Sequence, residues 1–116
     1  MGKINSKAKG SRFELTLAHY FEGKGFATRR TAQYCGNSGE AADVVGLPGI
    51  HIEAKHQEQM RLYDWMAQAV NDSEKSKRIP CVFHKKNRAE VLVTMRLDDW
   101  LSLYEEWLKN NLPFAE

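Results

Sequence analysis

The sequence predicts an α/β domain in which helices pack against a β-sheet. Two observations support this fold class. Short β-branched runs bounded by turn residues are typical of strands, and three longer segments carry apolar residues at helical spacing. A chain of 116 residues has room for one hydrophobic core. We therefore expect a single domain over residues 11–116, preceded by an N-terminal arm over residues 1–10.

The arm is expected to be flexible and basic. It shows no hydrophobic periodicity and carries Lys3, Lys7 and Lys9 among small polar residues. Such a segment can become ordered on a phosphate backbone. A solubilising tail is the alternative interpretation.

A helix is predicted from Ser11 to about Glu22, where apolar residues recur with helical spacing. Glu14 lies on the same stripe as Leu17, Ala18 and Phe21, so its carboxylate should face the sheet. Ser11 and Glu14 also match a capping box, in which the glutamate closes the helix N-terminus. Both roles of Glu14, helix cap and ligand in a functional site, remain open on the sequence alone.

A hairpin is predicted next, with strands Ala42–Gly46 and Ile50–Lys55 joined by a turn at Leu47-Pro48-Gly49. If the turn is centred on Pro48, Asp43 lies opposite Glu53, with Cβ atoms roughly 5 Å apart. Two carboxylates so close repel each other unless a cation lies between them.

Strand alternation places Lys55 on the same face as Glu53. A cation-binding carboxylate pair beside a lysine can activate water and neutralise a phosphate in a transition state. A solvated strand face with a cross-strand ion pair is the alternative. Glu14 is the best-placed third carboxylate, and it favours the metal site.

Three further elements complete the predicted sandwich. A helix is expected over about Gln59–Glu74, and it carries Gln68 on an otherwise ordinary polar face. A second strand pair is expected at Pro80–Lys85 and Ala89–Met95, joined near Asn87-Arg88. Asp98 can cap a final helix whose stripe contains Trp100, Leu103, Tyr104, Trp107 and Leu108. That helix covers either the sheet or a partner subunit.

With Glu14, Asp43, Glu53 and Lys55 in this order, the chain resembles the PD-(D/E)xK nuclease superfamily, and within it the archaeal-type Holliday junction resolvases. The likeness covers roughly residues 10 to 95. It includes the segment Lys24-Gly25-Phe26-Ala27 with the basic strand after it, and the loop Gly36-Asn37-Ser38-Gly39 before Asp43. One departure is Ala42, where this family often has proline.

The resemblance implies a restriction-endonuclease-like core, with a central mixed β-sheet flanked by helices. It also implies that Glu14, Asp43 and Glu53 bind Mg²⁺, for which Mn²⁺ can substitute, and that Lys55 assists the attacking water. Gln68 matches a polar position often seen near such active sites, although an exposed helical glutamine explains it equally simply. Arg30 and Ser38 would serve the DNA.

Charge is sorted along the chain in a way that suits a polyanionic partner. Residues 1–35 carry seven basic and two acidic side chains, a balance of +5, whereas residues 89–116 carry two and six, a balance of −4. Basic side chains in the first third and beside the second strand pair are therefore candidate DNA ligands: Lys3, Lys7, Lys9, Arg12, Arg29, Arg30, Lys85 and Lys86.

Composition is that of a folded protein outside membranes, with 42% hydrophobic and 28% charged residues and no membrane-spanning run. No signal peptide is evident, so we expect a cytoplasmic protein. Cys35 and Cys81 are expected to be reduced thiols. A zinc site that joins them to His51, His56 or His84 lacks the usual ligand spacing.

These observations predict a magnesium-dependent, structure-selective endonuclease that resolves four-way DNA junctions. Resolution needs two symmetric nicks, and one chain supplies one site, so we expect a homodimer. Two alternatives remain open. One is another nuclease of the superfamily, such as a restriction-type enzyme or a repair nickase, and the other is a DNA-binding module that has lost catalysis.

Overall fold

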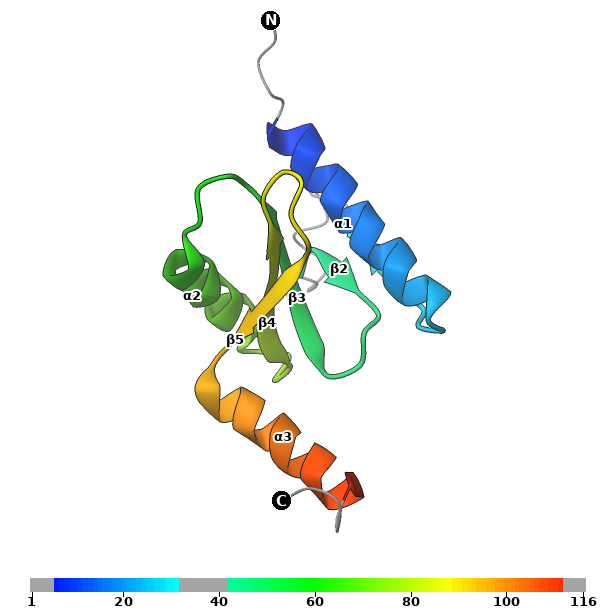
Figure 1. Ribbon diagram of the computed structural model, residues 1–116, viewed down its shortest axis with the longest axis vertical. Coiled ribbons are helices and arrows are strands. Elements are labelled where there is room, and N and C mark those ends of the chain that lie inside the picture. Colours follow the sequence, from blue (N-terminus) through cyan, green and yellow to red (C-terminus); the bar gives the residue numbers. More distant parts are fainter. Residues whose placement is uncertain (1–5, 32–41, 112–116) are drawn as a thin grey trace, which may run out of the picture.

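The computed structural model describes residues 6–31 and 42–111, which form a five-stranded sheet with helices on both faces (Figure 1). The strand order is β1-β2-β3-β4-β5, with only β3 and β4 parallel. The predicted α/β class and mixed sheet are therefore confirmed. The elements in chain order are α1 (Ser6–Gly23), β1 (Arg29–Arg30), β2 (Val44–Val45), β3 (Ile50–His56), α2 (Leu62–Ser73), β4 (Ile79–Lys85), β5 (Leu92–Met95) and α3 (Leu97–Asn111).

The centre of the sheet is the parallel pair β3–β4, and α2 is the crossover between these two strands. Both strands have a neighbour on each side, so their backbone groups are hydrogen-bonded and can be buried. Glu53 lies beside Val82 in this pair and is 2% exposed. A carboxylate is thus held in the most enclosed part of the sheet.

The two faces of the sheet bury separate apolar clusters. On one face Phe13, Leu17 and Ala18 of α1 pack against Ile52 and Ala54 of β3. On the other face Trp65 and Ala69 of α2 pack against Val82. This split follows from strand alternation, because odd and even positions of β3 point to opposite faces. The stripe predicted for the first helix is therefore confirmed.

Helix α1 begins at Ser6, five residues before the predicted start. Residues 6–10, predicted as part of the flexible arm, are helical. No proline interrupts this stretch, and its alanine and lysines favour helix. Lys9 is 9% exposed and its Nζ lies 3.6 Å from a carboxylate oxygen of Glu58. The capping-box prediction is consequently wrong, because Ser11 and Glu14 lie inside the helix.

The predicted hairpin register is observed at Val44 and Ile52, but the ladder changes at Asp43. The Asp43 amide donates to the Ile52 carbonyl at 3.0 Å, so Asp43 and Val44 both oppose Ile52, as in a β-bulge. Asp43 therefore precedes β2. The predicted direct pairing of Asp43 with Glu53 is not observed. The Asp43 side chain instead accepts a hydrogen bond from the Ala54 amide of β3.

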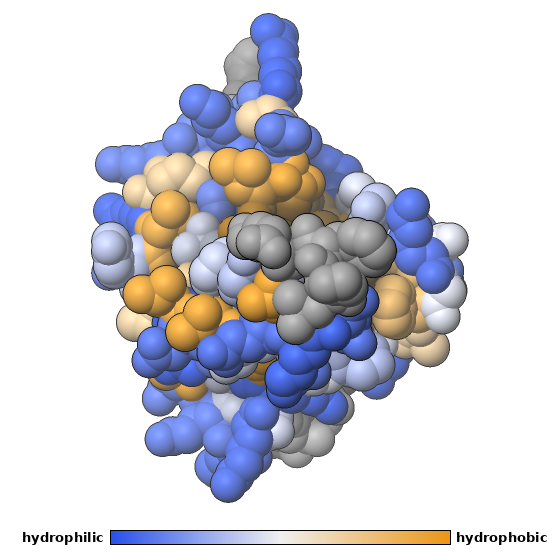
Figure 2. Space-filling model, turned by 60° about the horizontal axis from the view of Figure 1, so that its bottom comes forward, coloured by the Kyte–Doolittle hydropathy of each residue, from blue (hydrophilic) through white to orange (hydrophobic). Residues whose placement is uncertain are grey.

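Helix α3 extends away from the sheet, as Figure 1 shows, and it buries none of its residues against the described chain. It begins at Leu97, so Asp98 lies in the first turn and is not the predicted cap. The charge of Asp98 still complements the positive end of the helix dipole. Figure 2 brings this end of the molecule forward and shows hydrophobic side chains at the surface among hydrophilic ones.

No helix among the described residues is long and apolar enough to cross a bilayer.

Candidate active site

The structure places Asp43 and Lys55 near Glu53, and Glu14 near Asp43. Lys55 lies two residues further along β3, and its Nζ is 3.6 Å from Glu53 Oε2. Asp43 approaches from the bulge before β2, and its Oδ2 accepts a hydrogen bond from the Ala54 amide at 2.8 Å. Glu14 approaches from α1 and is close enough to affect the ionisation of Asp43.

The Asp43 carboxyl is strongly perturbed. Burial, followed by the negative charge of Glu53, raises its pKa from 3.8 to about 7, and Glu14 contributes in the same direction. The Ala54 hydrogen bond and the Lys55 charge oppose this rise. Asp43 therefore lies where burial and two neighbouring carboxylates disfavour its ionisation.

Arg30 of β1 holds Glu14 in place. Its Nε donates to Glu14 Oε1 at 2.7 Å, and a terminal guanidinium nitrogen donates to Ser11 Oγ at 2.8 Å. The Glu14 side chain is 14% exposed and that of Arg30 27%. The guanidinium thus bridges Glu14 and Ser11 and holds one carboxylate oxygen by a charge-assisted hydrogen bond. Arg30, predicted as a DNA ligand, thus contacts the predicted metal ligand directly.

Gln68 of α2, predicted as a possible supporting residue, lies against Lys55. Its Oε1 accepts a hydrogen bond from Lys55 Nζ at 3.4 Å. The same ammonium group faces Glu53. Lys55 is thus positioned from two sides, by a strand neighbour and by the helix that crosses over the sheet.

The charges of this cluster suit a divalent cation. Three carboxylates, Glu14, Asp43 and Glu53, meet two cationic groups, Arg30 and Lys55. The buried Glu53 Oε1 has no hydrogen-bond partner among the described residues. A buried carboxylate oxygen without a partner is costly. Oxygen ligands from carboxylates are those that Mg²⁺ and Mn²⁺ prefer, so the donor set fits such an ion.

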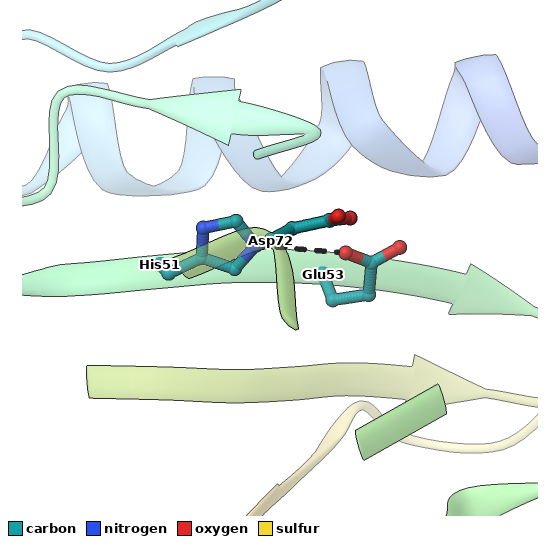
Figure 3. A group of neighbouring side chains, drawn as sticks. All are labelled: His51, Glu53 and Asp72. Carbon is teal, nitrogen blue, oxygen red and sulfur yellow. Dashed lines mark ion pairs between the residues drawn. The ribbon is translucent and has the colours of Figure 1, made fainter. Parts of the chain in front are cut away.

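Two further residues lie beside Glu53 (Figure 3). The sequence offered His51 only as a ligand of a zinc site with the cysteines, and it did not single out Asp72. His51 belongs to the same face of β3 as Glu53 and Lys55, and strand alternation could have identified it. Asp72 comes from α2. Only the docking of that helix brings it to the strand, so no local sequence signal marks it.

The predicted DNA ligands fall into different settings. Arg12 and Arg29 are exposed, and both line an open groove of about 490 Å³ between α1 and β1 that Arg30 also lines. Lys7 and Lys86 are exposed as well, while Lys85 is half-buried. Lys9 is buried against Glu58, so its predicted role in a free arm does not hold. Lys3, Ser38 and Cys35 lie outside the described residues.

The thiol of Cys81 belongs to the core below α1. Burial raises its pKa to about 11, which keeps it protonated and unreactive, in line with a structural role.

Comparison with known proteins connects this geometry to a family. Residues 5–116 match the family described as "Phage putative PDDEXK endonuclease". Among solved structures, the chain is similar to Archaeoglobus fulgidus Hjc, a Holliday junction resolvase from an archaeal hyperthermophile. The TM-score is 0.57 with 27% identity, over 75% of this chain and 72% of that chain. No curated protein sequence matches the chain.

The family match spans nearly the whole chain, and the solved structure shares its α/β core. The predicted membership of the PD-(D/E)xK superfamily is thereby confirmed. Nucleases of this kind typically use a divalent metal ion, which agrees with the acidic cluster around Glu53. This chain belongs to the family of phage PD-(D/E)xK endonucleases.

Proposed function

We propose that this protein is a magnesium-dependent endonuclease that resolves four-way DNA junctions by paired, symmetric nicks. The observation that carries the proposal is the setting of Glu53. Its carboxylate is buried, its Oε2 lies 3.6 Å from Lys55 Nζ, and its charge helps to raise the pKa of Asp43. That arrangement has an excess of negative charge inside the fold and a cation-binding donor set.

Each residue of the cluster has a role in the proposed hydrolysis. Glu14, Asp43 and Glu53 would hold Mg²⁺ or Mn²⁺. When bound, that ion supplies Lewis-acid polarisation of the phosphate and a lowered pKa of a bound water. Lys55 orients the attacking water and offsets the negative charge that develops on the phosphate. Gln68 and Arg30 act as positioning residues, through Lys55 and Glu14 respectively.

The preference for a junction is supported by the similarity to Archaeoglobus fulgidus Hjc. Two nicks at symmetric positions require two sites related by a two-fold axis, so the proposal includes a homodimer. Helix α3 is the best candidate for the contact between subunits. Leu97, Trp100, Leu101 and Tyr104 lie along one side of it and are 41–73% exposed, while Asp99 and Glu106 lie on the opposite side.

The test is cleavage of a labelled four-way junction against linear duplexes of the same arm sequences, with Mg²⁺ present. The unaltered protein should release nicked duplex products in symmetric pairs and leave the linear duplexes intact. Asp43→Asn and Glu53→Gln should each lower the cleavage rate by several orders of magnitude. Both should keep or increase affinity for the junction, because charge repulsion with phosphate is reduced.

Asp64→Asn is the matched control, since it removes an exposed carboxylate from the first turn of α2 that is not one of the proposed ligands. It should cut at the normal rate. Near-normal cleavage by Asp43→Asn or Glu53→Gln would refute the metal site. Equal cutting of junction and linear duplex would refute junction selectivity and favour a nickase of the same superfamily.

A further inference from the structure

A second group of potential metal ligands lies on the α2 side of β3. His51 and Glu53 occupy alternate positions of the strand, and Asp72 comes from the last turn of α2. Figure 3 shows the three side chains converging, with an ion pair between His51 and Glu53. One ligand atom from each residue lies within 4.8 Å of the other two.

The buried atoms of this group lack partners. The side chains of His51 and Glu53 are 3% and 2% exposed. His51 Nε2 lies 3.6 Å from Glu53 Oε1, which is too long for a hydrogen bond, and neither atom has another partner within the described chain. Native proteins rarely leave two buried polar atoms facing each other in this way. A small cation between them would satisfy both.

The distance between the His51 and Glu53 ligand atoms matches that of a metal site. Metal–ligand bonds of about 2.0–2.1 Å in a tetrahedral site keep neighbouring ligand atoms about 3.4 Å apart, and the nitrogen–oxygen distance here is 3.6 Å. One imidazole and two carboxylates form a donor set used by zinc and related ions. The set leaves one position open for water.

We propose that His51, Glu53 and Asp72 form a second divalent-cation site, selective for transition-metal ions of the Zn²⁺ class over Mg²⁺. The selectivity follows from the imidazole nitrogen, which such ions bind well and Mg²⁺ does not. Glu53 is then shared. Its Oε1 faces His51, and its Oε2 faces Lys55. This site goes beyond the proposed nuclease activity and does not depend on it.

The experiment is a Zn²⁺ titration of ¹⁵N-labelled protein in the absence of Mg²⁺, followed through the imidazole nitrogens of the histidines. Binding should shift the Nε2 resonance of His51. Calorimetry should give a stoichiometry of one ion per chain for that site. Asp72→Asn should weaken this binding at least tenfold. Asp72 is partly exposed, so its substitution tests the site even where a change at the buried His51 would disturb folding.

Two controls separate this site from the other carboxylates. Asp64→Asn, an equivalent change elsewhere on α2, should bind Zn²⁺ as the unaltered protein does. Asp43→Asn should also retain the His51 shift, although it is expected to abolish DNA cleavage. An unshifted His51 resonance, or Zn²⁺ binding by Asp72→Asn at full strength, would overturn the second site and leave the nuclease proposal intact. Retained Zn²⁺ binding without cleavage of any DNA by the unaltered protein would overturn only the nuclease proposal.

Discussion

At the scale of single residues, Asp43 links stability to function. Its folded-state pKa of about 7 lies above the ordinary 3.8, so the folded protein holds a proton that the unfolded chain has released between these values. The contribution of Asp43 to the stability of the metal-free protein is therefore greatest at low pH and falls as pH rises from about 4 to 7. The ionised Asp43 carboxylate destabilises the metal-free fold, and a bound cation would offset this effect.

Asp43→Asn should accordingly stabilise the metal-free protein at pH 8. Asparagine keeps an oxygen for the Ala54 amide and removes the buried charge. Each unit of pKa difference corresponds to about 1.4 kcal/mol, so the gain should be of order 1 to 4 kcal/mol. Thermal melts in EDTA at pH 5 and pH 8 measure it.

The comparison is made between the two proteins at each pH. Contributions from His56 and His84, whose pKa values are lowered by burial, then cancel. The difference between variant and unaltered protein should be larger at pH 8 than at pH 5. A variant that melts below the unaltered protein at pH 8 would contradict this account of Asp43.

At the scale of elements, Gly46 sets the distance between the end of β2 and the segment that leads into β1. It has φ +104°, and a Cβ there would lie 2.8 Å from both the Ala27 carbonyl carbon and Thr28 Cα. These are backbone atoms, which cannot move aside as a flexible side chain can. Gly49, in the same hairpin, has φ +79° but open space around its Cα.

Gly46→Ala should therefore destabilise the protein by several kcal/mol, since it combines backbone strain with a steric clash. Gly49→Ala carries the strain alone and should cost about 1 to 2 kcal/mol. Urea unfolding of the two variants measures the difference. Equal losses in both would show that the approach of β2 to residues 27–28 relaxes without cost.

Sequence patterns predicted elements well where the signal is local. Strands β3 and β4 and helix α2 lie within three residues of their predicted bounds, because their apolar residues follow a clear period. The early start of α1 was not predicted, because its helix-favouring alanine and lysines show no apolar period and the contact of Lys9 with Glu58 joins residues distant in sequence. The bulge at Asp43 likewise depends on pairing between strands.

The same distinction holds for the candidate site. Glu53 and Lys55 share a face through simple alternation, and the hairpin turn predicts that Asp43 is near them. The hydrogen bond from Arg30 to Glu14 joins residues 16 positions apart in sequence, so only the packed fold brings them together. Asp72 is at the site only because of the way that α2 crosses the sheet.

At the scale of the whole molecule, positive and negative charge lie on different parts of the chain. The groove between α1 and β1 is lined by Arg12, Arg29 and Arg30, whereas α3 carries four acidic side chains and one lysine. DNA attracted by the first surface would be repelled by the second. The groove is thus the expected path of the phosphate backbone.

The double change Arg12→Gln and Arg29→Gln should weaken junction binding and reduce its salt dependence. Each lost phosphate contact lowers the log-log slope by about 0.9, so the slope should become shallower by about 1.8. Fluorescence anisotropy at several salt concentrations measures it. Lys109→Gln, on α3, is the control and should leave the slope unchanged. An unaltered slope in the double variant would exclude this groove as the DNA path.

Helix α3 should control the oligomeric state. Removing two large exposed aromatic side chains, by Trp100→Ala with Trp107→Ala, should convert a dimer to monomers with little loss of fold, because both residues are about half exposed in the single chain. Sedimentation velocity measures the mass. Tyr63→Ala, which removes a 93% exposed aromatic from α2, should remain dimeric. A dimer that survives the α3 changes would place the contact elsewhere.

The distribution of the three tryptophans gives the molecule separate optical reporters. Trp65 of α2 points into the core and is 5% exposed, so its emission should be blue-shifted and iodide should not quench it. Trp100 and Trp107 stand on α3 at 49% and 53% exposure and should be quenched readily. Loss of iodide quenching of Trp100 and Trp107 on association would therefore report contact at α3. A red shift of the Trp65 emission would report the opening of the core between α2 and the sheet.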